Sequence, residues 1–595
     1  MARPPLFHFP FSLFHSVIYS RRPVRLQTLL KRSTPVPKHA FFAFAKFSLV
    51  VVAGLAIFAG PSVAQTPPIP PQVGSQNTVT AAPPVPRPQT TPCVVTLFAD
   101  YAFENFNAQT FSYTPPANCP GPWEKIVFEA NFNVTAGVQY DRTAAIYLGH
   151  ANIYYGTTPE PSENFGPSWH IERDLTDYAS LFTNPQSGEV DLGNLVDSTY
   201  TGIIYGTAVV ELYPLAEHAS APITPDAVYP MPDAEGGAAT LNTTTDQLTA
   251  TFTLPANIER AYLDVITQNQ SSDEFWYTCV PNDVAAELES CGNTAFREAE
   301  ISVDGTPAGV APVYPWVFTG GVDPWLWFPL PGVQTLDFVP YRVDLTPFAG
   351  LLSNGQPHTV AVSVYNADSY FLATASLLVY LDHGSTQITG EVTENTIGAG
   401  PNPDVDENLT TNTNGSIDGS VSVSSSRSFE IAGFVNTSHG RVTTHVYQDV
   451  DFENTQQFTI NATQYDQDIT QNTHVNSTTL TRNGLQVFAT YEQFKYPLVF
   501  DIDVIYNSDG SADQVSTVHQ GYESDILSPN FIGAVSNHVD STDTLVFAAD
   551  GSYSNQNQKS DQTYITGNTT GYHYDCTLEA ANNVLTSIGR GCSQK

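Results

Sequence analysis

The chain has 595 residues, of which 22 are Lys or Arg and 59 are Asp or Glu, so its formal net charge is −37. A surface this acidic repels a phosphate backbone, which excludes nucleic acid as an expected partner. The hydrophobic fraction of 41% is ordinary for a globular protein. Two or three domains are predicted, because single cores rarely grow past about 250 residues.

Residues 1–64 have the pattern of a secretory signal peptide. They contain eight Lys or Arg and no acid, then an apolar run over residues 47–59, then the small-residue site Ser62-Val63-Ala64. The apolar run is shorter than the roughly 20 residues that span a bilayer, which favours a cleaved signal over a membrane anchor. We therefore predict a secreted protein, extracellular or periplasmic, whose formal charge changes from −37 to −45 when those eight cations are lost.

The six Cys fall into three close pairs, and an even number at short spacing in an exported chain predicts local disulfides. The predicted pairs are Cys93 with Cys119, Cys279 with Cys291, and Cys576 with Cys592. No Cys-x-x-Cys occurs, which argues against a structural zinc site. We expect neither a metal nor a cofactor.

Residues 65–92 are rich in Pro, Thr and Gln and are predicted to be an extended linker. A first β domain is expected over residues 93–215, with one helical turn near 174–182. Its β-rich runs are short, are separated by Pro, Gly and Asn, and cover residues 123–134, 138–148, 190–195 and 203–213. Many short strands with turn signals between them predict an antiparallel sandwich or jelly roll.

Residues 216–238 are predicted to connect to a second β-sandwich over residues 240–384, which holds four of the six Trp. From 385 to 595 Thr, Ser, Asn and Gln dominate while apolar residues still alternate, which predicts a long β-meander with a polar outer face. The predicted fold class is therefore all-β: two adjoining antiparallel jelly-roll or β-sandwich domains followed by a polar β-meander region. We expect that last region to be a scaffold or adhesion module without chemistry of its own. Asp404, Asp406 and Asn408 alternate like calcium ligands but lack the Gly of such a loop, so an exposed loop is expected there.

The stretch 138–149 is the strongest candidate for catalytic residues. As a strand it would place Ala144, Ile146 and Leu148 on a core face and Asp141, Thr143 and Tyr147 on the opposite, polar face, with Asp141 at its entry. Arg142 follows Asp141, and a cation there can keep a carboxylate ionised or bind an oxyanion. By itself such a pair is more often a structural ion pair.

The second domain brings acids and indoles together in the sequence. Asp-Glu-Phe-Trp-Tyr occupies 273–277, Phe-Arg-Glu occupies 296–298, and 319–327 reads Thr-Gly-Gly-Val-Asp-Pro-Trp-Leu-Trp. Aromatic rings stack on sugar faces and carboxylates bind hydroxyls or move protons, so this composition suits a carbohydrate pocket. The alternative is a Trp-rich core with acids at its rim.

At these motifs the chain resembles the peptide-N-glycosidase A type amidases of plants, fungi and bacteria. The resemblance also rests on Tyr-Asp-Arg with Ile-Tyr-Leu-Gly (140–149), Thr-Pro-Glu-Pro (158–161) and Leu-Gly-Asn-Leu-Val-Asp-Ser-Thr-Tyr-Thr-Gly (192–202). It runs in matching order from about residue 93 to 382 and is much weaker beyond 385. It implies hydrolysis of the amide between an Asn side chain and the first N-acetylglucosamine, which leaves Asp on the peptide and releases the glycan as a glycosylamine.

The F-type peptide-N-glycosidases are similar at a greater distance, and they imply two adjoining jelly rolls with the active site between them. Their essential aspartate lies in a Trp-Asp-Arg motif, which residues 140–142 of this chain match as Tyr-Asp-Arg. Glu274 is the best counterpart of a second acid. A third pocket carboxylate falls where this chain has Asn194, which leaves Glu160 as a candidate substitute.

We therefore predict that Asp141 activates water, that Arg142 offsets developing negative charge, and that Glu274 acts as partner acid or substrate clamp. The predicted substrate-binding residues are Glu160, Asn194, Asp273, Trp276, Arg297, Trp325 and Trp327. N-glycopeptides and N-glycoproteins are the expected partners. Two alternatives remain: a glycan-binding protein without turnover, and a glycosidase that uses Asp141 and Glu274 as its carboxylate pair. A chain ending near residue 385 is expected to retain some turnover if it folds.

Overall fold

The computed structural model describes residues 70–398 and 400–593. The predicted signal peptide and the first residues of the predicted linker lie outside the described residues. Residues 70–92 contain neither helix nor strand, yet they pack against the protein. Gly74 and Leu585 are joined by a main-chain hydrogen bond, the main-chain N–H of Thr78 donates to Ser168, and Ala81 is fully buried. The predicted extended linker therefore packs against the protein over residues 70–92.

The first sandwich consists of two four-stranded antiparallel sheets. One has the order β1 (Cys93–Phe103), β8 (Ile204–Pro214), β3 (Trp123–Val134), β6 (Ser168–Asp174). The other has the order β2 (Gln109–Tyr113), β7 (Gln186–Leu192), β4 (Thr143–Leu148), β5 (Ala151–Thr157). This order, with strands that alternate between the two sheets along the chain, is that of a jelly roll. The core between the sheets is rich in aromatic side chains, including Phe128, Phe132, Tyr154 and Trp169.

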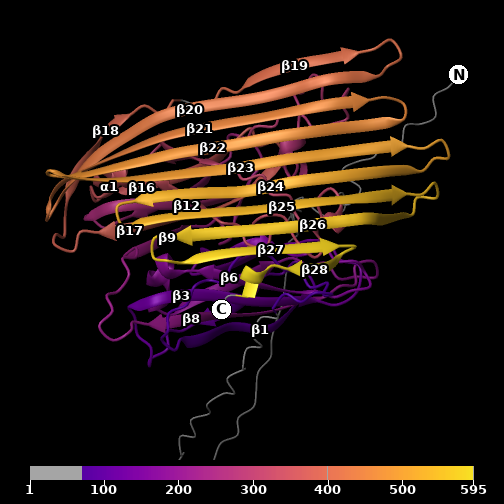
Figure 1. Ribbon diagram of the computed structural model, residues 1–595. Helices are drawn as coiled ribbons and strands as arrows, with labels where there is room; N and C mark the ends of the chain where they lie inside the picture. The colour runs from indigo at the N-terminus through magenta and orange to yellow at the C-terminus, as the bar shows by residue number, and fades with distance from the viewer. Residues whose placement is uncertain (1–69, 399, 594–595) are drawn as a thin grey trace, which may run out of the picture. The chain divides into compact units, whose positions relative to one another are not determined.

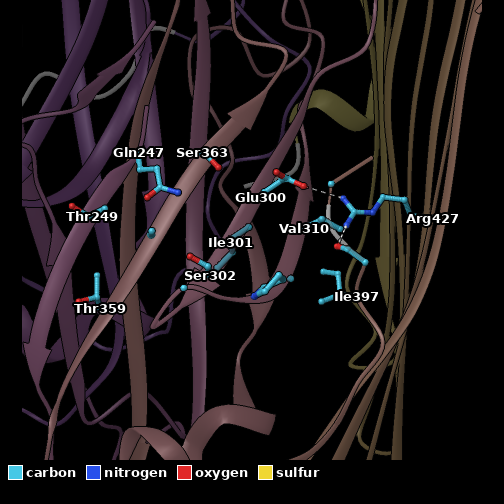
Figure 2. Close-up of a pocket in the computed structure, with 16 residues that line it drawn as sticks. Gln247, Thr249, Glu300, Ile301, Ser302, Val310, Thr359, Ser363, Ile397 and Arg427 are labelled. Carbon is cyan, nitrogen blue, oxygen red and sulfur yellow. Dashed lines mark hydrogen bonds and ion pairs between the residues drawn. The ribbon is translucent and has the colours of Figure 1, made fainter. Parts of the chain in front are cut away.

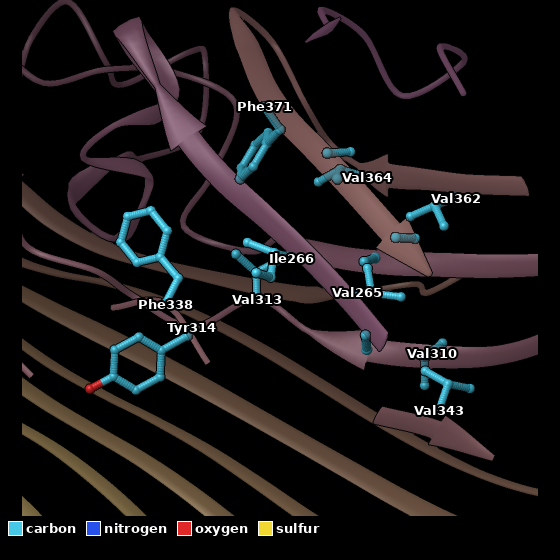
Figure 3. Packing of buried hydrophobic residues seen from close by; sticks show 14 of the residues in the cluster. Val265, Ile266, Val310, Val313, Tyr314, Phe338, Val343, Val362, Val364 and Phe371 are labelled. Carbon is cyan, nitrogen blue, oxygen red and sulfur yellow. The ribbon is translucent and has the colours of Figure 1, made fainter. Parts of the chain in front are cut away.

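The second sandwich repeats the same strand order. One sheet is β10 (Ala239–Leu241), β17 (Tyr370–Leu381), β12 (Ile258–Gln270), β15 (Tyr341–Asp344), with β9 (Ala227–Met231) also paired to β17. The other is β11 (Leu248–Thr253), β16 (Pro357–Tyr365), β13 (Glu298–Val303), β14 (Thr306–Pro312). Figure 3 shows branched and aromatic side chains of β12, β14, β16 and β17 filling the space between the sheets. The predicted pair of jelly rolls is confirmed, although β9 lies inside the stretch expected to be a connection.

Short helical segments lie in the connections. They are η1 (Thr176–Thr183), η2 (Ser271–Asp273), η3 (Trp276–Thr278), η4 (Pro324–Trp327), η5 (Thr346–Phe348), α1 (Ala349–Leu352) and η6 (Arg590–Ser593). The first of them matches the helical turn predicted near 174–182. Within the part of the chain that the structure describes, no helix has the length and apolar character needed to cross a membrane.

Strand β4 is buried on both faces, which differs from the sequence prediction. Ala144, Ile146 and Leu148 belong to the core of the first sandwich as expected. Tyr147, expected on a polar face, is 3% exposed and packs in the core of the second sandwich. The prediction of a polar face was wrong because alternation shows which side chains share a face and does not show what covers that face.

The C-terminal region forms one antiparallel sheet of 11 strands. Its long strands lie side by side in orange and yellow in Figure 1. Its strands are β18 (Thr389–Asn395), β19 (Asp404–Thr411), β20 (Ile417–Thr437), β21 (Gly440–Ile460), β22 (Gln464–Asn483), β23 (Gln486–Tyr506), β24 (Ala512–Ser528), β25 (Phe531–Phe547), β26 (Tyr553–Asn568), β27 (His573–Ala581) and β28 (Val584–Ile588). The predicted β-meander is confirmed. Asp404 and Asp406 lie in strand β19 and not in the expected loop.

The inner face of this sheet belongs to the core of the second sandwich. Val450, Phe452 and Phe500 cluster with Trp276 and Phe296 of the sandwich, and the ring centroids of Phe296 and Phe452 are 5.0 Å apart. The second sandwich and the C-terminal sheet therefore share one hydrophobic core.

The three predicted disulfides are present in the structure. Cys93 is bonded to Cys119, Cys279 to Cys291, and Cys576 to Cys592. The second of these closes the segment that follows Glu274, so it limits the movement of a loop that carries a candidate catalytic residue.

Candidate active site

Three carboxyl groups meet where the two jelly rolls face each other. Asp141 lies in the β3–β4 loop, Glu160 follows β5, and Glu274 lies in the β12–β13 loop between η2 and η3. The main-chain N–H of Asp141 contacts Oε2 of Glu160 at 3.3 Å, and the main-chain N–H of Gly320 donates to Oδ2 of Asp141 at 3.0 Å. The first jelly roll thus supplies two acids, and the second supplies one acid and a main-chain donor.

Gly320 could not be replaced by a larger residue without displacing this cluster. A Cβ atom there would lie 2.4 Å from Oε2 of Glu160 and 2.8 Å from Oδ1 of Asp141. The residue is therefore required to be Gly by the close approach of the two carboxylates. Sequence reasoning selected 319–327 for its Trp and missed Gly320, although the Gly-Gly pair was a signal that a backbone must come close to something.

The three carboxyl groups differ in exposure, and the pKa of two of them is raised. Asp141 and Glu160 are partly exposed, whereas Glu274 is only 4% exposed. Burial and the nearby charge of Asp141 raise the pKa of Glu160 well above its usual range, and the same two causes raise the pKa of Glu274. These shifts favour the protonated forms of Glu160 and Glu274, which suits them to act as acids.

Arg142 is held beside the cluster by several contacts. Its main-chain N–H donates to Oγ1 of Thr158 at 2.9 Å, its Nε donates to Oδ1 of Asn194 at 3.4 Å, and its guanidinium lies 5.0 Å from the centre of the Tyr140 ring. A cation fixed in this way beside Asp141 is placed to stabilise an oxyanion that forms at the carboxyl cluster.

Asn194 is a buried anchor for Arg142. It is 0% exposed, and its Nδ2 donates to the carbonyl oxygens of Phe103 at 2.9 Å and Gly202 at 3.1 Å. Its prediction as a substrate-binding residue is therefore wrong, because every polar atom of its side chain is directed into the protein.

A tyrosine pair on the same side was missed by sequence reasoning. The hydroxyl oxygens of Tyr140 and Tyr200 are 2.6 Å apart and the ring centroids 4.7 Å apart, with both residues partly exposed. Burial, the hydrogen bond to Tyr200 and the charge of Glu160 raise the pKa of Tyr140. Both rings come from motifs used for the family resemblance, and that was the available signal.

Two of the three predicted sugar-stacking indoles are in the core. Trp276 and Trp327 are 0% and 1% exposed, and Nε1 of Trp327 donates to the carbonyl oxygen of Gly321 at 3.0 Å. The prediction that they stack on a sugar is wrong, and the alternative of a Trp-rich core is the correct one for them. Of the six Trp, all of which are among the described residues, Trp325 alone is partly exposed.

Asp273 and Arg297 also have a structural role. Both side chains are 1% exposed, and Nε and Nη2 of Arg297 donate to Oδ1 of Asp273 at 3.0 and 2.8 Å. Oδ2 of Asp273 accepts the main-chain N–H groups of Asp368 and Ser369. The prediction that they bind substrate is therefore wrong: this buried, fully bonded pair fixes the turn in which Glu274 sits.

A cavity of about 270 Å³ lies elsewhere, between the second sandwich and the C-terminal sheet (Figure 2). Its lining includes Gln247, Glu300, Ser302 and Arg427 and none of the clustered carboxyl groups. Arg427 of β20 is bonded to Glu298 and Glu300 of β13, which ties the sheet to the sandwich. We assign this region a structural role.

Clustered carboxyl groups, two of them with a raised pKa, and a fixed guanidinium at the junction of two jelly rolls have the properties of a hydrolase site, because such groups activate water and protonate a leaving group. Residues 82–397 match the family described as Peptide N-acetyl-beta-D-glucosaminyl asparaginase amidase A, and residues 420–498 match the family described as PNGase_A C-terminal domain. The chain belongs to the peptide-N-glycosidase A family.

One relative is the Peptide-N4-(N-acetyl-beta-glucosaminyl)asparagine amidase A of Prunus dulcis. It is 31% identical over 393 residues, which are 62% of this chain and 67% of the relative. Among solved structures, PNGase F of Flavobacterium meningosepticum is 14% identical, with a TM-score of 0.33 over 49% of this chain and 96% of its own. PNGF-II is 12% identical, with a TM-score of 0.35 over 49% of this chain and 66% of its own.

Proposed function

We propose that this chain is a peptide-N-glycosidase, which hydrolyses the amide between an Asn side chain and the first N-acetylglucosamine of an N-glycan and converts that Asn to Asp. The meeting of the Asp141 and Glu160 carboxyl groups beside Gly320 carries the proposal, because it places a candidate base next to a carboxyl group whose raised pKa suits an acid, at one partly exposed position. Family membership supports the same reaction.

The reaction assigns each group one step. Asp141 takes a proton from water as the water oxygen forms a bond to the amide carbon, and the negative charge that develops on the carbonyl oxygen lies near Arg142. Glu160 then gives its proton to the nitrogen as the C–N bond breaks. The products are Asp on the peptide and a glycosylamine, and the proton on Asp141 restores Glu160.

Glu274 has a positioning role in this scheme. Its side chain is almost fully buried, and this burial together with the charges of Asp141 and Glu160 raises the pKa of Glu274 well above its usual range, so Glu274 lies within electrostatic range of both. From the sequence, Glu274 was predicted to be partner acid or substrate clamp. In this scheme Glu160 takes the role of partner acid, and Glu274 contributes to the electrostatics of the cluster.

Product analysis tests the proposal. A glycopeptide is incubated with the full chain in water enriched in heavy oxygen, and the peptide is analysed by mass spectrometry. Conversion of Asn to Asp with one heavy oxygen in the new carboxyl group is expected. A peptide that keeps one sugar on Asn would show a glycosidase, an unchanged glycopeptide that still binds would show a glycan-binding protein, and either result would contradict the proposal.

We also propose that the protein acts outside the cytoplasm. The signal-like pattern of residues 1–64 motivates this, and three disulfides support it because such bonds persist in oxidising compartments. Expression of the full gene product with its own N-terminus, followed by N-terminal sequencing of the protein in the medium or periplasm, is expected to give a chain that starts near Gln65. Retention of the full chain inside the cell would contradict secretion.

A further inference from the structure

The loop of residues 319–327 joins the carboxyl cluster to the C-terminal sheet. Gly320 at its start contacts Asp141, and Trp325 near its end is the partly exposed indole described above. Asn583, in the β27–β28 turn, donates its Nδ2 to the carbonyl oxygen of Trp325 at 3.0 Å, and Ser541 of β25 donates to the carbonyl oxygen of Leu326 at 2.6 Å. The C-terminal sheet therefore holds the main chain of the segment that carries the Trp325 ring.

A buried carboxyl pair strengthens this attachment. Asp323 accepts the main-chain N–H of Trp325 at 3.0 Å, and both Asp323 and Asp543 of β25 are almost fully buried. Burial and the adjacent Asp543 raise the pKa of Asp323 well above its usual range, which favours the protonated form of Asp323 beside Asp543. Val322 between them and Gly320 has φ of +68°, a strained conformation for a β-branched residue, which persists only where the surroundings impose it.

The sheet also places an aromatic ring of its own next to Trp325. Tyr553, the first residue of β26, is 48% exposed, and its ring centroid lies 5.7 Å from that of Trp325 with 75° between the planes. The two rings therefore form an open corner. Burial and the charges of Glu160 and Glu163 raise the pKa of Tyr553, so this corner lies within electrostatic range of the carboxyl cluster.

The side chains around Tyr553 suit a saccharide. Strand β26 begins Tyr553-Ser554-Asn555-Gln556-Asn557, which contributes neutral hydroxyl and amide groups without a cation or an anion. Such groups donate and accept hydrogen bonds with sugar hydroxyls, and an aromatic face covers the apolar C–H face of a sugar ring.

We propose that Trp325 and Tyr553 together bind a sugar of the N-glycan that lies beyond the first N-acetylglucosamine, so that the C-terminal sheet contributes directly to substrate specificity. The first sugar must sit at Asp141 and Glu160 for its amide to react, which leaves the corner for a more distant residue of the glycan. This inference rests on the proposed amidase function.

The test compares two substrates with the full chain: a glycopeptide that carries a complete N-glycan, and the same peptide with a single N-acetylglucosamine on Asn. Tyr553→Ala is expected to raise KM for the complete glycan about tenfold, the upper range of one aromatic contact, with little change in kcat. The preference for the complete glycan over the single sugar is expected to fall by the same factor. Tyr553→Phe, which keeps the ring, is expected to recover most of the lost affinity.

Tyr491→Ala is the matched control. Tyr491 is 49% exposed on the same sheet, but it pairs with Leu527 at the opposite end of the strands from Tyr553, so its removal is expected to leave both substrates unaffected. If Tyr553→Ala raises KM equally for both substrates, Tyr553 contacts the peptide or the first sugar, and the inference is overturned. An unchanged KM for both substrates would also overturn it. If the parent chain converts neither substrate, the proposed amidase function fails first.

Discussion

The two jelly rolls have the same strand order but contribute different groups at the same topological positions. The third connection of each sandwich, β3–β4 in the first and β12–β13 in the second, carries Asp141 and Glu274. The segment after the fifth strand carries Glu160 in the first and the Gly320 loop with Trp325 in the second. The comparison shows that the shared topology makes equivalent loops of the two jelly rolls face each other. The residues in those loops give the first jelly roll the groups for proton transfer and the second a main-chain hydrogen-bond donor and an aromatic surface.

The two sandwiches also differ in how they are stabilised. The core of the first consists almost wholly of its own residues, whereas the core of the second merges with the inner face of the C-terminal sheet. Amide groups of Asn454, Gln456 and Gln467 donate to the carbonyl oxygens of Tyr277, Cys279 and Thr278, just after Glu274. Half of the site therefore depends on the sheet for its geometry.

Removal of residues 386–595 is expected to have the largest effect. It would expose the shared core around Trp276 and Phe296 and leave the carbonyl groups of residues 277–279 without their donors, so we expect an unfolded or aggregated product with no turnover. Near-ultraviolet circular dichroism and sedimentation of the shortened chain are the measurements. This reverses the expectation drawn from the sequence, and a folded, active product would restore it.

Asp141→Asn tests the contribution of the first jelly roll. The amide cannot accept the proton of water, so we expect turnover to fall roughly a hundredfold to ten-thousandfold. The free energy of unfolding is expected to change by only about 0 to 1 kcal/mol, since the side chain is partly exposed. The measurements are the rate of Asn-to-Asp conversion and the thermal unfolding curve of the variant. Turnover within a few-fold of the parent would return Asp141 to the role of a structural residue.

Glu274→Gln tests the contribution of the second jelly roll through pH dependence. A carboxyl group whose pKa is raised on folding contributes stability that is present below its unfolded pKa and is lost as pH rises toward the folded value. The neutral amide does not incur this loss, so we expect the variant to be more stable than the parent at about pH 8, by on the order of 1 kcal/mol, and closer to it at about pH 4. Turnover is expected to fall. Thermal unfolding at both pH values measures the effect, and a variant less stable at high pH would contradict it.

A substitution on the outer face of the C-terminal sheet is expected to raise stability at high pH in the same way as Glu274→Gln, but by less. Asp501 faces Asp468 across β22 and β23, and Asp503 faces Asp466. Burial and these neighbouring charges raise the pKa of Asp501 to about 6, so the stability it contributes in acid is lost as pH rises through that value. We expect Asp501→Asn to raise the melting temperature at about pH 8 more than at about pH 5. Asp525→Asn on the exposed face of β24 is the matched control, and equal effects at both pH values would contradict the prediction.

The sequence by itself determined the all-β class, the two jelly rolls, the long meander and the three disulfides, because period-two alternation, turn residues and short Cys spacing are local signals. It also indicated Asp141, through a contiguous motif. Only the tertiary structure decided that β4 is buried on both faces, that Asp273 bonds to Arg297 while its neighbour Glu274 joins the carboxyl cluster, and that Trp325 faces solvent while Trp276 and Trp327 do not. The physical reason is that burial and pKa depend on which segment covers a residue, and here the covering segments lie 100 to 200 or more residues away along the chain.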